Sequence, residues 1–327
     1  MLKKMINNAR IDIEIHPKDP MLIKSGLAAV GGVDMAFVRT YREDGKEEPF
    51  IPGSSIKGMF RSYAEKICRS LQLQDKPVPV CLPYLDPKDE KDGEKRQASC
   101  GLRFEKDKKK ETIPSTDLYN LSCPACRLFG SNVFIGRFAT SDAYITDEFR
   151  QNGQPVFEIR DGVAIDRLTG GAARGAKYNL EVLTRGEFST TLEIRNFERW
   201  QLGLIGLVLR DMEQGLVRAG FGKSRGLGSF NAKIINFQLA YYNQSPKELS
   251  GLSRLVSEKE ASDYGFFEET DEKGPLLPDL QKEGLRSIYN LTDTWKETLK
   301  PAVNDLVKYI ETVKWPKNIE DFIAGRN

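Results

Sequence analysis

A nine-residue segment at positions 220–228 constrains this chain more than any other feature, because it combines four glycines with two cations. It reads Gly220-Phe221-Gly222-Lys223-Ser224-Arg225-Gly226-Leu227-Gly228. Glycines have no Cβ to hold a ligand away, so several backbone N–H groups can converge on one anion, and Lys223 and Arg225 supply the opposite charge. The segment therefore predicts a phosphate-binding loop.

This segment differs from a nucleotide-binding P-loop in two respects. The position of that motif's first glycine is Val217, and the pattern before the loop is helical, whereas a P-loop follows a strand. An extended phosphate backbone, RNA or DNA, is the better match. The residues expected to contact it here are Gly222, Lys223, Ser224, Arg225 and Gly226.

Three other motifs accompany the loop. They are Ile51-Pro52-Gly53-Ser54-Ser55-Ile56-Lys57-Gly58, Cys126-Arg127-Leu128-Phe129-Gly130, and Gly162-Val163-Ala164-Ile165-Asp166-Arg167 with Thr169-Gly170-Gly171-Ala172-Ala173. In this order, with the glycine-rich loop last, they resemble the RAMP superfamily, specifically the backbone subunits of type III CRISPR effectors with a zinc finger (III-A or III-D-like). The resemblance covers roughly residues 9–237.

The resemblance implies a guide RNA (crRNA), a target RNA and other subunits of the complex as partners. It also implies a thumb, a hairpin that crosses the guide RNA, in which Arg167, Arg174 and Lys177 would meet phosphates while the small residues between them pass the bases. A flexible exposed loop is the alternative interpretation of the same residues.

The hydrophobic pattern predicts an α+β fold. Ile11, Ile13 and Ile15 alternate with polar residues as in a strand, and residues 56–71 have helical spacing after a predicted Ser54 cap. Strands are expected at 138–145, 188–194 and 229–237, and the longest helix at 197–217. This order suits a ferredoxin-like or RRM-like β-α-β-β-α-β core, which the resemblance also implies.

Two insertions and a tail interrupt or extend that core. We expect residues 1–74 to form its first part, 75–128 a zinc-type insertion, and 129–237 the rest of the core, with the thumb at about 147–186. Residues 238–327 are expected to be an acidic linker and a helical tail.

The net charge of the chain is only +2, but its distribution is uneven. Residues 241–327 carry 12 Lys and Arg against 16 Asp and Glu, a net charge of −4, so the rest of the chain carries +6. We expect an RNA surface in that part. No apolar run approaches the length of a membrane span, and a cytoplasmic protein is expected.

Four of the five cysteines lie in or beside the charged insertion, at Cys81, Cys100, Cys123 and Cys126. Cys123-Pro124-Ala125-Cys126 has the spacing with which two thiolates bind one tetrahedral ion, and a short charged insertion needs such a source of folding energy. We predict a structural zinc site, with reduced structural thiols as the alternative.

The catalytic options are few. His16 is the only histidine, so a ribonuclease that uses two imidazoles is excluded within this chain. Asp34, after Gly31 and Gly32, could hold a divalent cation such as Mg²⁺ or Mn²⁺ at a scissile phosphate, and the resemblance implies that catalytic role. An ordinary turn aspartate is the alternative, and Glu43, Asp44, Glu47 and Glu48 follow nearby.

Further RNA contacts are expected at the start of the helix that Ser54 is predicted to cap. Ser54, Ser55 and Lys57 could bind an anion through free N–H groups, with plain N-capping as the alternative. Arg61, one turn further, and Arg137, beside the Leu-Phe-Gly motif, complete the predicted set.

Three functions fit these features. The first is a guide-binding subunit that cleaves target RNA at Asp34. The second is a scaffold of the same complex without cleavage, and the third is a guide-processing endoribonuclease, which the near absence of histidine disfavours.

Overall fold

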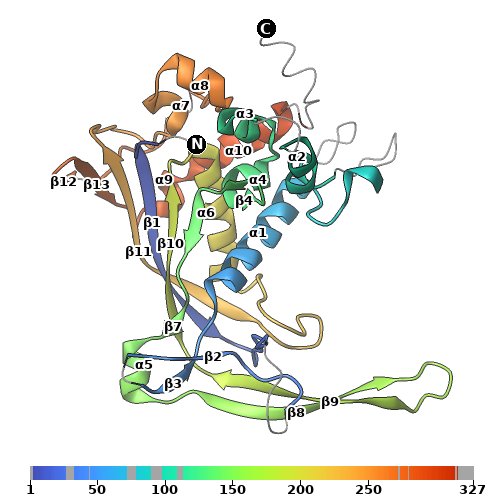
Figure 1. The fold of residues 1–327 in the computed structure, drawn as a ribbon. Helices are drawn as coiled ribbons and strands as arrows, with labels where there is room; N and C mark the ends of the chain where they lie inside the picture. The colour runs from blue at the N-terminus through green and yellow to red at the C-terminus, as the bar shows by residue number, and fades with distance from the viewer. Residues whose placement is uncertain are drawn as a thin grey trace.

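An antiparallel sheet forms the framework of the computed structural model, which describes residues 3–26, 33–43, 45–71, 79–89, 98–108, 113–271, 273–278, 280–313 and 315. The strand order is β12-β13-β11-β1-β10-β6, and β7 also pairs with β10 (Figure 1). The bounds are β1 (Asn7–Pro17), β6 (Phe138–Thr140), β7 (Tyr144–Ile145), β10 (Phe188–Arg195), β11 (Phe230–Tyr242), β12 (Gln281–Glu283) and β13 (Arg286–Asn290).

The alternation in β1 builds the centre of this sheet. Ile11, Ile13 and Ile15 are almost fully buried, and the residues between them are partly exposed. Ile11 lies opposite Leu192 of β10 on one side and Phe237 of β11 on the other, both of them buried. The strand predicted from the period-two pattern is therefore confirmed.

Two helices, α1 (Gly53–Ser70) and α6 (Arg199–Glu213), lie on one face of the sheet and contact each other (Figure 1). The chain order of this part is β1-α1-β6-β10-α6-β11. The prediction that 197–217 is the longest helix is wrong, because α6 has 15 residues and α1 has 18. The chain leaves the helix after Glu213 and turns at Gly215, whose φ of 73° glycine adopts without strain.

The C-terminal region packs on this core. α9 (Trp295–Thr298) and α10 (Lys300–Thr312) follow two strands that extend the sheet, so the predicted tail is helical only in part. Tyr309 of α10 stacks on Trp200 of α6 with ring centroids 4.3 Å apart. The preceding segment carries α7 (Leu252–Leu255) and α8 (Glu258–Tyr264).

The predicted insertion folds as short helices beside α1. They are η1 (Pro87–Asp89), α2 (Cys100–Lys108), α3 (Ser115–Leu121) and α4 (Pro124–Phe129), followed by the small strand pair β4 (Gly130–Ser131) and β5 (Phe134–Ile135). Cys81, Cys100, Cys123 and Cys126 lie among the buried residues of the main core. The insertion thus shares the core of the chain.

A long hairpin projects from the opposite end of the molecule (Figure 1). Its strands are β8 (Val156–Ile165) and β9 (Ala172–Arg185), within the range expected for the thumb. The neighbouring elements are α5 (Asp147–Asn152) and the strand pair β2 (Arg39–Tyr41) and β3 (Glu47–Pro49). Isolated bridges from Met21 to Leu183 and from Met35 to Leu180 attach the base of the hairpin to the body.

Within the described part of the chain, none of the helices has both the length and the apolar character needed to cross a membrane.

Candidate nucleic-acid interface and metal centre

The glycine-rich loop is held by tight backbone packing at both ends. A Cβ at Gly220 would lie 2.3 Å from the Leu22 carbonyl oxygen, and one at Gly228 would lie 2.0 Å from that of Ala219. Both residues also have positive φ. Residues 223–226 between them are exposed. The outer glycines therefore fix the loop and leave its cationic tip exposed.

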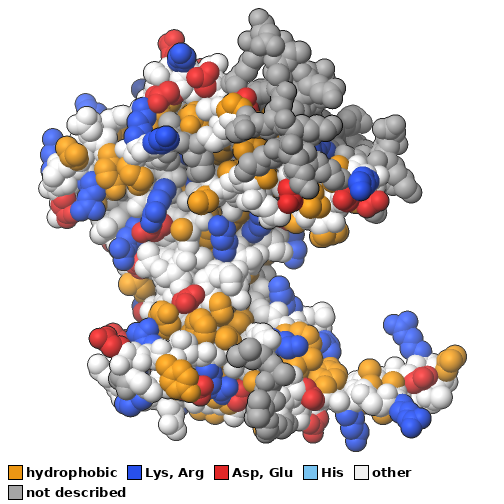
Figure 2. All heavy atoms as spheres, in the orientation of Figure 1, with side chains coloured by type: hydrophobic (Ala, Val, Ile, Leu, Met, Phe, Trp, Pro, Cys, Tyr) orange, Lys and Arg blue, Asp and Glu red, His pale blue; other side chains and the backbone are white. Residues whose placement is uncertain are grey.

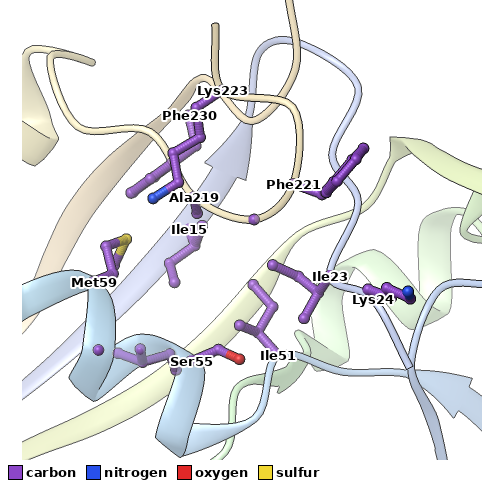
Figure 3. Close-up of a pocket in the computed structure, with 13 residues that line it drawn as sticks. Ile15, Ile23, Lys24, Ile51, Ser55, Met59, Ala219, Phe221, Lys223 and Phe230 are labelled. Atoms are coloured by element: carbon purple, nitrogen blue, oxygen red, sulfur yellow. The ribbon is translucent and has the colours of Figure 1, made fainter. Parts of the chain in front are cut away.

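The loop and the start of α1 form the two sides of one pocket of about 420 Å³ (Figure 3). Ser55, Gly58 and Met59 line it from α1, and Gly220, Phe221 and Lys223 line it from the loop. Lys24 is at the rim from a third segment. Two motifs that are about 165 residues apart in the sequence thus line the same pocket.

A hydrogen bond joins the loop to the hairpin. Arg225 Nη1 donates to the Tyr178 hydroxyl at 2.7 Å, and its guanidinium lies 5.0 Å from the centroid of the Phe221 ring. The Tyr178 ring covers Gly162 on the opposite strand, where a Cβ would be 2.3 Å from the ring. Gly162 therefore allows Tyr178 to take the position from which it accepts this bond.

Cations follow the outer part of the hairpin. Arg167, Arg174 and Lys177 are all exposed, and Figure 2 shows Lys and Arg side chains on the hairpin beside a hollow in the molecular surface. The Asp166 carboxylate accepts N–H groups of Thr169 and Leu168, which lowers its pKa and orders the turn. The predicted thumb cations therefore lie on an ordered, projecting ribbon.

Asp34 lies at the base of the same hairpin. Its backbone N–H donates to Asn179 Oδ1 at 2.6 Å, and its carboxylate Oδ2 accepts the Asn179 backbone N–H at 2.9 Å. Asn179 follows Tyr178, so Asp34 and Arg225 bind neighbouring residues, whose Cα atoms are about 3.8 Å apart. The preceding Gly31 and Gly32 lie outside the described residues, as does Asp44.

An ion pair fixes this region to the hairpin. Arg39 donates to both carboxylate oxygens of Glu181, at 2.8 and 2.6 Å, and the Phe37 N–H donates to the same carboxylate. The hydrogen bond from Arg39 lowers the pKa of Glu181. Asp34 thus lies in a segment that is fastened to β9 on both sides of Met35.

The start of α1 differs from its prediction. Pro52, and not Ser54, is the N-cap, and the Gly53 N–H donates to the Asp142 carboxylate at 2.7 Å. A carboxylate therefore already accepts the Gly53 N–H, and the Pro52 carbonyl accepts the Ser55 N–H, so neither of these N–H groups is free for an anion. Both serines are exposed, and burial, followed by repulsion from Arg61, lowers the pKa of Lys57.

The four insertion cysteines form one buried cluster. Their Sγ atoms all lie within 4.8 Å of one another, and those of Cys81 and Cys126 are 3.6 Å apart. Cys123 caps α4, where its sulfur accepts the Cys126 N–H. Hydrogen bonds from the neighbouring thiols, that of Cys100 foremost, lower the pKa of Cys81. Four sulfur donors at this spacing suit a tetrahedral ion such as zinc.

A comparison with protein families shows the family of this chain. The model of the RAMP superfamily matches residues 14–231. The chain belongs to the RAMP superfamily. This superfamily includes CRISPR-associated proteins that bind RNA. No curated protein matches the chain.

Two predicted RNA contacts of this RAMP chain turn inward instead. Arg61 donates to the Gly130 carbonyl, to Glu65 and to Cys126 Sγ. Burial acts to lower the pKa of Arg61, but the charges of Cys126 and Glu65 outweigh it and raise that pKa. Arg137 is 4% exposed, and its guanidinium lies 4.4 Å from the centroid of the Tyr119 ring. Neither side chain is presented to the pocket.

Three residues of this interface are not marked by any sequence motif. Lys24 belongs to no motif, Tyr178 is an uncharged neighbour of Lys177, and Asn179 acts partly through its backbone. Their roles depend on contacts between distant segments. Of the three, only Tyr178 could have been suspected from the sequence, because it is an aromatic residue next to the predicted phosphate contact Lys177.

Proposed function

We propose that this chain is a guide-binding backbone subunit of a type III CRISPR ribonucleoprotein that cleaves guide-paired target RNA. The family match supports an RNA-binding CRISPR-associated role. The order β11-β1-β10-β6, with helices after the first and third core strands, supports a ferredoxin-like core. The observation that carries the proposal is the shared pocket of the glycine-rich loop and α1, next to a projecting cationic hairpin.

Backbone contacts in this arrangement would hold the guide without reading its sequence. Lys223, Ser224 and Arg225 on the loop, with Ser54, Ser55 and Lys57 on α1, would bind phosphates, and Gly222 and Gly226 would let the backbone approach. Arg167, Arg174 and Lys177 would do so along the thumb. Base pairing between guide and target would supply the specificity.

Replacing Lys223 and Arg225 by alanine tests this assignment. Each phosphate contact with single-stranded RNA adds about 0.7 to the slope of log affinity against log salt, so we expect weaker binding of all sequences and a slope smaller by about 1.4. Lys259→Ala with Lys308→Ala, which removes two exposed cations from α8 and α10, is the matched control. Equal salt slopes in both double variants would remove the loop from the RNA surface.

Asp34 would supply the chemistry. Its carboxylate would accept the proton of the target 2′-hydroxyl. The 2′-oxygen would form a bond to phosphorus while the bond from phosphorus to the 5′-oxygen breaks, and the 5′-oxygen would take up a proton. The products are a 2′,3′-cyclic phosphate and a 5′-hydroxyl. A divalent cation such as Mg²⁺ or Mn²⁺ would neutralise the phosphate. One carboxylate with RNA phosphate oxygens suits the way Mg²⁺ binds.

The second candidate is the non-catalytic scaffold of the same complex. It is favoured by the Asn179 N–H that already binds the Asp34 carboxylate, and by the absence, among the described residues, of a group of three or more His, Cys, Asp or Glu side chains that includes Asp34 and could hold a metal ion. Cleavage by the assembled complex distinguishes the two. Processing of unprocessed repeat RNA by the isolated chain would instead support the endoribonuclease.

The cysteine cluster would hold a structural zinc ion in this proposal. Cys81, Cys100, Cys123 and Cys126 would bind it as thiolates, and the ion would stabilise the short helices around it. The other subunits of the complex would be protein partners of the chain. Sequencing the RNA that co-purifies with the chain would reveal whether it carries a repeat-derived guide.

A further inference from the structure

The bond between Arg225 and Tyr178 occupies a side chain that the proposed function needs for RNA. Arg225 is exposed on the glycine-rich loop, yet its Nη1 already donates to the Tyr178 hydroxyl at 2.7 Å. The acceptor is an uncharged oxygen of the same chain. A phosphate oxygen carries negative charge, so Coulomb attraction adds to any hydrogen bond that it accepts from a guanidinium. RNA phosphate and Tyr178 therefore compete for Arg225.

The same bond holds the hairpin at the point where its other attachments end. Asn179 binds Asp34, and Glu181 binds Arg39, both nearer the base of the hairpin. Among the described residues of the hairpin, Tyr178 is the one nearest the tip that forms a hydrogen bond with the body. Breaking this bond would leave the outer part of the ribbon, from the Val163–Lys177 pair onward, free to move against the body.

Both partners are kept in position by their neighbours. Gly162 lies opposite Tyr178 in the register of the hairpin, and a Cβ on Gly162 would be 2.3 Å from the Tyr178 ring. The ring therefore lies over the glycine, from where its hydroxyl reaches the loop. On the other side, the Arg225 guanidinium lies 5.0 Å from the centroid of the Phe221 ring. The contact is thus built into both the hairpin and the loop.

We propose that the Arg225–Tyr178 bond is an autoinhibitory contact, which closes the hairpin onto the glycine-rich loop in the free chain and opens when an RNA phosphate takes Arg225. This inference rests on the proposed RNA-binding function and adds a conformational step to it. In the bound state Tyr178 is released, and the outer hairpin can adjust to the RNA. Because RNA has to displace Tyr178, the apparent affinity of the wild-type chain is lower than that of a chain without the contact.

Tyr178→Phe tests this contact, because it keeps the ring over Gly162 and removes only the acceptor. A typical net hydrogen bond corresponds to a factor of about 2 to 10 in an equilibrium constant. We therefore expect Tyr178→Phe to bind a short single-stranded RNA more tightly by about that factor. In the free chain, the amides of the outer hairpin should exchange hydrogen faster. Tyr84→Phe, which changes a tyrosine that is 81% exposed, is the matched control and should behave like wild type.

An Arg225→Ala background separates the contact from general effects of the substitution. In that background Tyr178→Phe has no bond to break, so it should change neither RNA affinity nor hydrogen exchange. Gly162→Ala is the second variant, since it keeps the hydroxyl but pushes the ring away, and it should act as Tyr178→Phe does. Its control is Gly171→Ala in the same hairpin, where the nearest atom to a Cβ is 3.7 Å away.

Weaker RNA binding by Tyr178→Phe would assign the hydroxyl to the RNA surface and overturn the autoinhibitory role. Unchanged affinity and exchange would overturn it as well, and so would equal effects with and without Arg225. If the wild-type chain binds no RNA, the proposed function fails too. RNA binding with the expected salt dependence of the loop, but without any effect of Tyr178→Phe, overturns the autoinhibitory contact alone.

Discussion

At the scale of single residues, Asp34 combines a structural bond with a proposed chemical role. One carboxylate oxygen accepts the Asn179 N–H, which orients the side chain beside β9. Asparagine can keep that acceptor but cannot take up the proton of a 2′-hydroxyl. Asp34→Asn therefore separates the two roles more cleanly than alanine does.

We expect Asp34→Asn to reduce target cleavage by the assembled complex at least about 100-fold while guide loading and target binding stay nearly unchanged. Chelation of divalent cations and a 2′-deoxy substitution at the cut site should each stop the reaction. Glu43→Gln, an exposed carboxylate of the neighbouring loop, is the control. Full cleavage by Asp34→Asn would favour the scaffold.

Arg61 connects the cysteine cluster to the helix that lines the pocket. It donates to Cys126 Sγ at 3.4 Å and to the Gly130 carbonyl at 2.9 Å. Hydrogen bonds to ligand atoms orient them, and their loss typically lowers metal affinity 10- to 100-fold. Arg61 is therefore a positioning residue for the proposed zinc ion.

We expect the purified chain to carry about one zinc ion, Cys123→Ser to lose it, and Arg61→Ala to release it at roughly tenfold lower chelator concentration. Competition with a chromogenic chelator measures both effects. Lys66→Ala, an exposed cation on the same helix, should behave like wild type. Equal zinc retention in Arg61→Ala and Lys66→Ala would contradict the positioning role.

At the scale of elements, the Arg39–Glu181 pair fastens the hairpin to the segment that carries Asp34. Arg39 forms two charge-assisted hydrogen bonds with Glu181, and both side chains are partly buried. Glu181→Gln keeps the shape but removes the charge. We expect it to destabilise the chain by about 1 kcal/mol, a modest value because water screens the pair in part.

The pH dependence of that difference follows from the direction of the pKa shift. Arg39 lowers the pKa of Glu181 in the folded chain below its ordinary 4.5, so the folded state binds the proton less tightly than the unfolded state. The stabilisation is complete above pH 4.5 and is lost as the pH falls through the lowered pKa. Denaturant titrations of wild type and Glu181→Gln should converge on acidification, and a constant difference would contradict this origin.

The elements also show what a sequence pattern can predict. The strand at 7–17 and the pairing of Cys123 with Cys126 follow from spacing, because alternation and a Cys-x-x-Cys pair fix geometry locally. The inward turn of Arg137 does not, since its partner ring, Tyr119, comes from a distant helix. The hydrogen bond from the Gly53 N–H to the Asp142 carboxylate could not be predicted either, because its partner comes from a distant part of the sequence. The sequence alone leaves that N–H free for an anion.

At the scale of the whole molecule, the C-terminal region and the core share one interface. Arg199 of α6 donates to the buried Asp305 of α10 at 2.6 Å. Beside this pair, α10 approaches so closely that a Cβ on Gly203 would be 2.1 Å from the Ala302 carbonyl oxygen. The two regions should therefore unfold together, although their net charges differ in sign.

Gly203→Ala tests this coupling, and Gly58→Ala is its matched control, because both replace a helical glycine but only Gly203 has backbone against it. In the exposed control, helix propensity should raise the free energy of unfolding by up to about 1 kcal/mol. In Gly203→Ala, the free energy of unfolding should fall by about 1–3 kcal/mol, because the methyl group pushes α10 away from α6. Denaturation followed by tryptophan fluorescence reports on this region through the buried Trp200 of α6 and through Trp295 and Trp315 of the C-terminal region, and circular dichroism reports on the whole chain. We expect one transition for both signals, at lower denaturant in Gly203→Ala. A separate early transition of the fluorescence, with the dichroism midpoint unchanged, would show that the C-terminal region is an independent unit.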